Sequence, residues 1–179
     1  MPTRALHPVV RRCLLAALIS ATALAPTRAT AQEEVFLGIN GWDRTAGYNG
    51  VVAYRCASSI CADGSDVSYK RQPHRPAITL AEFEAHHRKL AAEYRGTGKI
   101  QDLRISEPKQ RVIEGVRVLQ VRRDFDWVDG TKHVLIEARL IGPQKSYSVV
   151  SSSPKELWSV NNFEGFLPRL VDITLINNP

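Results

Sequence analysis

Residues 116–141, VRVLQVRRDFDWVDGTKHVLIEARLI, hold the pattern that decides the fold. Apolar side chains alternate along both halves of this stretch, at Leu119, Val121, Phe125 and Trp127 and then at Val134, Ile136, Ala138 and Leu140. Alternation with a period of two is typical of a β-strand with one buried face. Val116 and Val118 stand in the opposite phase, which predicts either a bulge or a strand buried on both sides. The Asp-Gly pair in VDGTKH predicts a hairpin turn between the two strands.

Further strands are predicted on either side of this hairpin. Downstream, GPQK predicts a turn and SYSVVSS a third strand, so residues 112–152 form an antiparallel meander. Upstream, GVVAYRC and VSYKR predict another hairpin within residues 50–71. Between the two groups, KIQDLRISEPKQ, residues 99–110, predicts a single extended stretch.

Two helices are predicted beside these strands. Residues 78–95 carry an apolar stripe at helical spacing, at Leu80, Phe83, His87, Leu90, Ala91 and Tyr94. Thr79 and Glu82 have the spacing of a capping box at the start of this helix. At the end of the chain, Ser153 is predicted to cap a second helix, and Pro168 is predicted to kink or restart it. The closing ITLI fits either a last helical turn or an edge strand. The fold class is therefore α+β, with an antiparallel β-sheet packed against two main helices.

The order of these elements resembles that of PsbP-like domains. The resemblance covers residues 67–176 and rests on the meander followed by SSSPKELWSVNNFEGFLPRLVDITL, with its Ser/Pro-capped stretch and its final Phe-rich helix. It implies a PsbP-like sandwich and a role in assembly, chaperone-like or accessory binding rather than catalysis. The segment before residue 67, with its cysteine loop, departs from the family pattern.

The N-terminus has the pattern of a secretory signal. Basic residues precede the apolar run CLLAALISATALA, residues 13–25, and Ala29-Thr30-Ala31 supplies an A-x-A cleavage site. The run is short for a membrane-spanning helix, so an uncleaved anchor is the less favoured alternative. Cys13 begins the apolar run, away from the cleavage site, and gives no lipoprotein signal. We therefore expect residues 1–31 to be a signal peptide and residues 32–179 to be a single exported domain, periplasmic or secreted, with no transmembrane segment after cleavage.

Signal cleavage changes the charge of the protein. The full chain has 24 Lys and Arg against 18 Asp and Glu, a formal charge of +6. Four of the basic residues, Arg4, Arg11, Arg12 and Arg28, and no acidic residue lie in residues 1–31. The expected mature chain therefore carries 24 − 4 = 20 basic and 18 acidic residues, a charge of +2. Without a clustered basic field, a nucleic-acid partner is not expected.

Two cysteines remain in the expected mature chain, Cys56 and Cys61, within YRCASSICADGSD. Structural zinc sites usually need four ligands, and redox pairs favour two intervening residues at a helix start. Neither pattern is met. In an oxidising compartment the pair predicts one structural disulfide that braces a turn.

Histidines and carboxylates are the candidate sites of chemistry in this sequence. His86 and His87 are adjacent on the predicted helix and point about 100° apart, so they do not readily chelate one ion. His87 falls on the apolar stripe, and His86 is placed to pair with Glu82. The hairpin carries a mixed charge cluster, for which a partner-binding surface is the hypothesis beyond a solvated strand face: Arg122, Asp124, Asp126, Asp129, Lys132 and His133.

These observations favour a non-catalytic binding or accessory module of the bacterial envelope. Its expected partner is another envelope protein or a small ligand, and no catalytic residue, metal or other cofactor is expected. Two alternatives remain open. One is a small exported hydrolase built from His86, His133 or the hairpin carboxylates, and the other is an envelope inhibitor or immunity protein.

Overall fold

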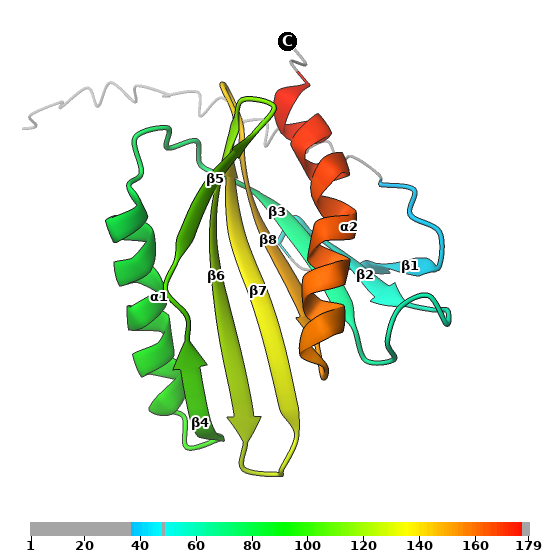
Figure 1. The fold of residues 1–179 in the computed structure, drawn as a ribbon, viewed down its shortest axis with the longest axis vertical. Coiled ribbons are helices and arrows are strands. Elements are labelled where there is room, and N and C mark those ends of the chain that lie inside the picture. Colours follow the sequence, from blue (N-terminus) through cyan, green and yellow to red (C-terminus); the bar gives the residue numbers. More distant parts are fainter. Residues whose placement is uncertain (1–36, 48, 177–179) are drawn as a thin grey trace, which may run out of the picture. The chain divides into compact units, whose positions relative to one another are not determined.

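Eight strands and two helices make up the part of the chain that the computed structural model describes, residues 37–47 and 49–176 (Figure 1). In chain order they are β1 (Trp42–Ala46), β2 (Val51–Cys56), β3 (Asp66–Gln72), α1 (Leu80–Arg95), β4 (Ile100–Ile105), β5 (Lys109–Ile113), β6 (Val116–Trp127), β7 (Lys132–Ile141), β8 (Ser146–Ser153) and α2 (Glu156–Leu175). The described residues belong to one compact unit, Gln32–Pro179. The predicted signal peptide and its cleavage site lie outside the described residues.

All strands pair antiparallel in one sheet, in the order β1-β2-β3-β8-β7-β6-β4, with β5 also paired to β6. The predicted α+β class, with an antiparallel sheet and two helices, is confirmed, and so is the meander. The single extended stretch predicted at 99–110 is wrong, because it is divided into β4 and β5. Ser106 bridges the gap: its N–H donates to the Arg122 carbonyl at 3.0 Å, and its hydroxyl accepts the Arg122 N–H at 3.1 Å.

Strands β6 and β7 are buried on both faces over part of their length, because alternate residues pack against different helices. Val118 and Leu140 pack with α2 on one face, whereas their neighbours Leu119 and Ile141 pack with Phe83 of α1 on the other. Consecutive strand residues point to opposite faces, so these pairs place the two helices on opposite sides of the sheet. The strand buried on both sides, one of the two predictions for Val116 and Val118, is therefore confirmed.

Helix α1 begins with the predicted capping box. The Thr79 hydroxyl accepts the Glu82 N–H at 3.1 Å, and the Glu82 carboxylate accepts the Thr79 N–H at 2.7 Å. The buried face of the helix consists of Phe83, His87 and Ala91, which confirms the centre of the predicted stripe, whereas Leu80 and Leu90 are partly buried and Tyr94 is exposed. It contacts β4 and β6, so α1 covers only part of its side of the sheet.

Helix α2 differs from the prediction at its start. Lys155, not Ser153, occupies the N-cap, and it makes no side-chain capping bond. Ser153 is the last residue of β8, and its hydroxyl accepts the Lys155 N–H at 3.2 Å. The helix runs through Pro168, which is exposed, so water can hydrate the carbonyl that proline leaves unbonded. The closing ITLI is helical up to Leu175.

A disulfide joins Cys56 and Cys61 in the loop between β2 and β3, as predicted; their Cα atoms are 5.8 Å apart. The loop packs against the chain before β1, where the Ser58 hydroxyl donates to the Gly41 carbonyl at 3.3 Å. Gly41 has a φ of +79°, and a Cβ there would lie 2.3 Å from the Ser58 hydroxyl. No helix in the described part of the chain is long and apolar enough to cross a membrane.

Candidate ligand-binding site

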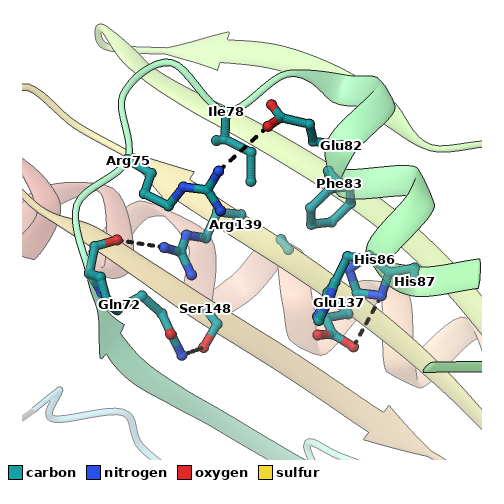
Figure 2. A pocket seen from close by; sticks show the side chains of 12 residues that line it. Gln72, Arg75, Ile78, Glu82, Phe83, His86, His87, Glu137, Arg139 and Ser148 are labelled. Carbon is teal, nitrogen blue, oxygen red and sulfur yellow. Dashed lines mark hydrogen bonds and ion pairs between the residues drawn. The ribbon is translucent and has the colours of Figure 1, made fainter. Parts of the chain in front are cut away.

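A cavity of about 400 Å³ opens where α1 stops covering the sheet. Its lining residues come from β3, β7 and β8, from α1, and from the segment that leads into α1 (Figure 2). They are Gln72, Pro73, Arg75, Ile78, Glu82, Phe83, His86, His87, Glu137, Ala138, Arg139 and Ser148. The cavity therefore joins segments that are far apart in the sequence.

A buried ion pair lies at one end of the cavity. Arg123, which is 4% exposed, donates a hydrogen bond from its guanidinium to the Glu137 carboxylate. The same guanidinium lies over the rings of Tyr94 and Phe125, 5.6 and 5.7 Å from their centres. Burial raises the pKa of Glu137, while the Arg123 charge opposes that rise. The carboxylate is thus committed to Arg123 rather than free to act on a ligand.

His87 packs beside this pair as a neutral side chain. Burial lowers its pKa to about 3, with the neighbouring Arg123 charge acting in the same direction. Its Nδ1 lies 3.8 Å from the Glu137 carboxylate and has no hydrogen-bond partner among the described residues, and its ring stacks edge-on against Phe83 at 4.3 Å. The assignment of His87 to the apolar side of its helix is confirmed. Because the imidazole is neutral, the 3.8 Å contact is not an ion pair at neutral pH.

Two arginines form the opposite wall. Arg139 extends from β7 and donates to the Pro73 carbonyl at 2.7 Å. Arg75 reaches in from the segment before α1, and its guanidinium is 3.5 Å from the Glu82 carboxylate. Burial and the nearby Arg75 charge lower the pKa of Arg139, although a guanidinium stays protonated in proteins. Ile78 and Phe83 supply apolar surface beside these groups.

The hydroxyl and imidazole groups of the cavity are not arranged as a nucleophile and its base. Ser148 accepts a hydrogen bond from the Gln72 amide at 2.8 Å and contacts the Lys70 carbonyl at 3.5 Å. His86 is exposed, and its ring lies 5.3 Å from that of His87. The Glu82 carboxylate, the predicted partner of His86, accepts hydrogen bonds from Thr79 and Arg75.

Two serine–histidine contacts lie elsewhere on the same side of the sheet. His74 Nδ1 is 3.1 Å from the Ser146 hydroxyl, and His133 Nδ1 is 3.4 Å from the Ser152 hydroxyl. Ser146 is fully buried, so a substrate cannot reach it. An activated serine also needs a group that orients its base, and no carboxylate in the described chain hydrogen-bonds to either imidazole.

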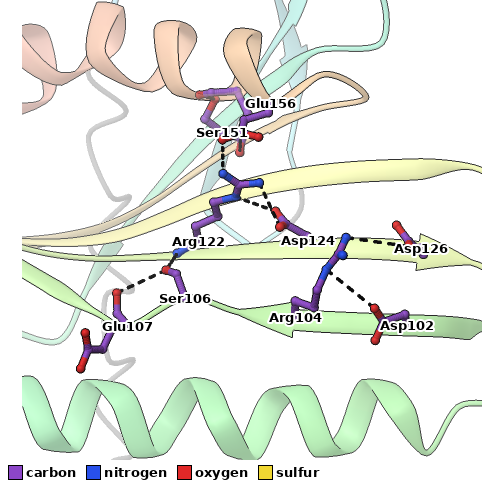
Figure 3. A network of polar contacts seen from close by, with 10 residues as sticks. Asp102, Arg104, Ser106, Glu107, Arg122, Asp124, Asp126, Ser151 and Glu156 are labelled. Atoms are coloured by element: carbon purple, nitrogen blue, oxygen red, sulfur yellow. Dashed lines mark hydrogen bonds and ion pairs between the residues drawn. The ribbon is translucent and has the colours of Figure 1, made fainter.

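Three of the charges predicted as a binding surface, Arg122, Asp124 and Asp126, make ion pairs within the chain (Figure 3). Arg122 donates two hydrogen bonds to the Asp124 carboxylate, at 2.7 and 2.9 Å, and a further hydrogen bond to Glu156 in the first turn of α2. Asp126 lies 3.5 Å from Lys132 and 3.9 Å from Arg104. These contacts gather four of the predicted residues on the α2 side of the hairpin.

The other two predicted residues lie apart from that group. Asp129 accepts hydrogen bonds from the Thr131 N–H and hydroxyl at 2.9 and 2.6 Å, which lowers its pKa and closes the turn. His133 pairs in register with Phe125, one residue away from the Asp126–Lys132 pair, so it points to the α1 side. The described hairpin therefore presents the six residues on two faces and a turn.

The charges that shape the cavity were not predicted from the sequence. Glu137 and Arg139 alternate with the apolar residues of VLIEARLI, and this pattern is typical of a strand with a solvated face. Helix α1 partly covers that face, which turns a solvated row into a cavity wall. Arg123 falls in the same alternating phase as the apolar Val121 and Phe125, and this position is the signal that could have indicated a buried charge.

Comparisons with known proteins do not assign a family. No family model matches the chain, and no curated protein matches it. Among solved structures, the crystal structure of a protein of unknown function, PA94 from Pseudomonas aeruginosa, is similar at 11% sequence identity with a TM-score of 0.48. The likeness covers 76% of this chain and 85% of that one. At this level it carries no argument about function, so the function is argued from the site.

Proposed function

We propose that this protein is an exported, non-catalytic binding module of the bacterial envelope whose ligand site is the cavity between α1 and the sheet. The observation that carries the proposal is the construction of the cavity. Polar groups from three strands and charged groups from β7, α1 and the segment before α1 converge beside the apolar Ile78 and Phe83. Concave sites of several hundred Å³ with a few positioned polar groups are typical of small-ligand binding.

Binding is favoured over catalysis because the polar groups of the cavity are held by structural contacts. Ser148 is bonded to Gln72, and Glu137 is bonded to Arg123. A hydrolase needs a nucleophile or water activated by a base within hydrogen-bond reach. The alternative hydrolase residues His86 and His133 are separated, since His86 lines the cavity and His133 contacts Ser152 outside it.

Export is supported by two features of the chain. The first is the basic, apolar and A-x-A sequence of residues 1–31. The second is the Cys56–Cys61 disulfide, which persists in oxidising compartments. We also propose that the domain is related to PsbP-like proteins, whose accessory binding roles agree with a non-catalytic module.

The hairpin between β6 and β7 is proposed as a second contact surface, for another envelope protein. Lys132 and Asp129 are exposed, and Lys132 lies beside the paired Arg122, Asp124 and Asp126. A patch of this kind contributes to recognition through several contacts together. Simultaneous Asp129→Asn and Lys132→Ala substitution should weaken capture of an envelope partner while leaving the unfolding midpoint nearly unchanged, because the asparagine keeps a side-chain oxygen that can accept the Thr131 hydrogen bonds.

The cavity proposal is tested by a fragment screen on the purified protein, read by backbone NMR shifts. Fragments should perturb residues around the cavity, such as Ser148 and Phe83. Ser148→Phe places an aromatic ring in the cavity and should abolish the perturbations. Ser152→Phe is the matched control, because Ser152 lies on the same strand and face but does not line the cavity. Binding unaffected by Ser148→Phe, or no fragment perturbing the cavity, contradicts the proposal.

A further inference from the structure

We propose that the cavity takes a small amphiphilic ligand whose anionic group, a carboxylate or a phosphate, lies between Arg75 and Arg139. This inference rests on the proposed function, because it names the ligand class for the same cavity. It follows from three features: unbalanced positive charge, unused hydrogen-bond donors and an adjoining apolar wall.

Arg139 has donor capacity that the described chain does not use. One terminal nitrogen donates to the Pro73 carbonyl at 2.7 Å, which fixes the guanidinium at the cavity wall. Its Nε is buried and has no partner, and no carboxylate of the described residues forms an ion pair with it. Burying a charge without a counterion is costly, so a bound anion would stabilise this side chain.

Arg75 adds a second, weakly balanced charge. Its contact with the Glu82 carboxylate is long, at 3.5 Å, and 62% of the Arg75 side chain is exposed. Glu82 is at the same time bonded to the Thr79 N–H at 2.7 Å and the Thr79 hydroxyl at 3.0 Å in the capping box. The Glu82 carboxylate therefore caps the helix and contacts Arg75 at the same time. The weak contact leaves Arg75 able to turn toward a stronger acceptor.

The remaining acid of the cavity does not offset these charges. Glu137 is bonded to the buried Arg123, so its charge is already matched. In Figure 2 the Arg75 and Arg139 side chains lie next to each other, across the cavity from Glu137. The proximity of Arg75 also lowers the pKa of Arg139, as expected for two cations held close. Paired guanidinium groups match the geometry of carboxylate and phosphate oxygens.

The rest of the ligand is set by the apolar wall. Ile78 and Phe83 line the cavity beside the arginines and belong to the apolar cluster under α1. A purely inorganic anion would leave this surface unused, and a neutral hydrocarbon would leave the arginines unbalanced. A short acyl or alkyl chain with a terminal anionic group can pair with the arginines and also pack against the apolar wall.

The test uses protein purified after expression of the full chain and four probes: octanoate, octyl phosphate, octanol and inorganic phosphate. Affinities are measured by calorimetry, with NMR shifts at cavity residues to locate binding. At least one of octanoate and octyl phosphate should bind at least about tenfold more tightly than octanol, because a hydrogen bond to a charged group is roughly twice as strong as a neutral one. Inorganic phosphate should bind more weakly than octyl phosphate if the apolar wall contributes.

Arg139→Gln should reduce the affinity for the anionic probe by about tenfold or more and should not change that for octanol. Arg117→Gln is the matched control, because Arg117 also extends from a strand and donates to a carbonyl of the same segment, that of Pro76 at 2.6 Å, but does not line the cavity. Arg75→Gln, at an exposed loop position, repeats the test without risk to folding.

Three results would overturn the anion site at the two arginines. They are equal affinity for octanol and both anionic probes, an anion affinity unchanged in both arginine variants, and no cavity shift with any octyl probe. If inorganic phosphate binds as tightly as octyl phosphate, the apolar wall does not contribute to binding. That result would overturn the proposal that the ligand is amphiphilic. The fragment screen distinguishes failure of this inference from failure of the proposed function. If the octyl probes fail but neutral fragments bind the cavity, the binding function is upheld and only the anion inference is wrong.

Discussion

Arg123 illustrates how single residues hold the site in place. A guanidinium that is 4% exposed loses its hydration, and here one carboxylate and two aromatic faces replace part of the lost water, while Nε and Nη1 have no hydrogen-bond partner among the described residues. Removing Glu137 alone would leave the charge buried without a counterion, which typically costs several kcal/mol. The pair therefore positions β6, β7 and α1 relative to one another at the end of the cavity.

His87 gives the protein a predicted loss of stability in acid. Its folded pKa of about 3 lies below the unfolded value of 6.5, so below about pH 6.5 the unfolded chain binds a proton that the folded chain does not. The free energy of unfolding should fall as pH decreases from about 6.5 towards 3, by up to roughly 1.4 kcal/mol per pH unit. Urea titrations of the wild type and His87→Leu at several pH values measure the difference.

The free energy of unfolding of His87→Leu should change less with pH than that of the wild type. The His86→Leu variant, changed at the exposed neighbouring position, should show the same pH dependence as the wild type. The raised pKa of Glu137 has the opposite sign: the folded carboxyl takes up its proton first, so acid favours folding through this group. Glu137 is present in all three proteins, so its effect largely cancels in the comparison. Parallel curves for the wild type and His87→Leu would rule out a buried neutral His87.

At the scale of single elements, the hairpin of β2 and β3 depends on its loop. The disulfide closes a short ring, and the loop rests against the chain before β1 through Ser58 and Gly41. The strands themselves are held by the buried Tyr54 and Tyr69, whose rings stack at 6.3 Å. The disulfide should therefore brace the loop without being required for the fold.

Replacing both Cys56 and Cys61 by Ser should lower the free energy of unfolding by about 2 kcal/mol, because the reduced unfolded chain gains conformational freedom. The far-ultraviolet circular dichroism spectrum should be unchanged. Ser59→Ala, at an exposed position in the same loop, serves as control and should have little effect. Loss of the folded spectrum in the double variant would show that the disulfide is required for folding.

The packing of α2 gives a paired prediction at two glycines. A Cβ at Gly142, after β7, would lie 2.7 Å from the Thr174 methyl group and 2.8 Å from the Thr174 carbonyl. Gly142→Ala should therefore destabilise the protein by roughly 1–3 kcal/mol. Gly165→Ala, inside α2, meets nothing within 4 Å and should stabilise it by up to about 1 kcal/mol. Thermal unfolding of both variants measures the two changes in stability. Equal changes in the two variants would contradict the close approach of α2 to Gly142.

At the scale of the whole molecule, the proposed ligand site depends on how far each helix extends over the sheet. Helix α2 contacts β6, β7 and β8 with a mostly apolar face, and α1 contacts β4 and β6. The part of β7, β8 and β3 that α1 leaves open carries Glu137, Arg139, Ser148 and Gln72. The cavity is thus a product of incomplete coverage, not of any single motif.

Export is the prediction that concerns the whole chain. If residues 1–31 act as a signal peptide, protein recovered from the bacterial envelope should begin at Gln32. N-terminal sequencing measures this, and Ala29→Arg and Ala31→Arg together should block cleavage, whereas Gln32→Ala should not. Envelope protein that retains Met1 in the wild type would contradict cleavage.

The sequence by itself determined the strands of the meander, the capping box of α1, the buried stripe with His87 and the cysteine pairing. Each of these depends on neighbours a few residues apart, so local periodicity or spacing is enough to predict it. The start of α2 was predicted less well, because Ser153 is held by β8 pairing, which prevails over its capping preference.

Only the tertiary structure decided which charges meet. Arg75, Arg139 and Glu82 come from three segments, and their neighbourhood depends on how far α1 extends over the sheet. Likewise, the six hairpin charges formed one group in the sequence but are divided by strand alternation and ion pairing. Alternation indicates that a strand has two faces, but which face a helix covers depends on packing between distant elements.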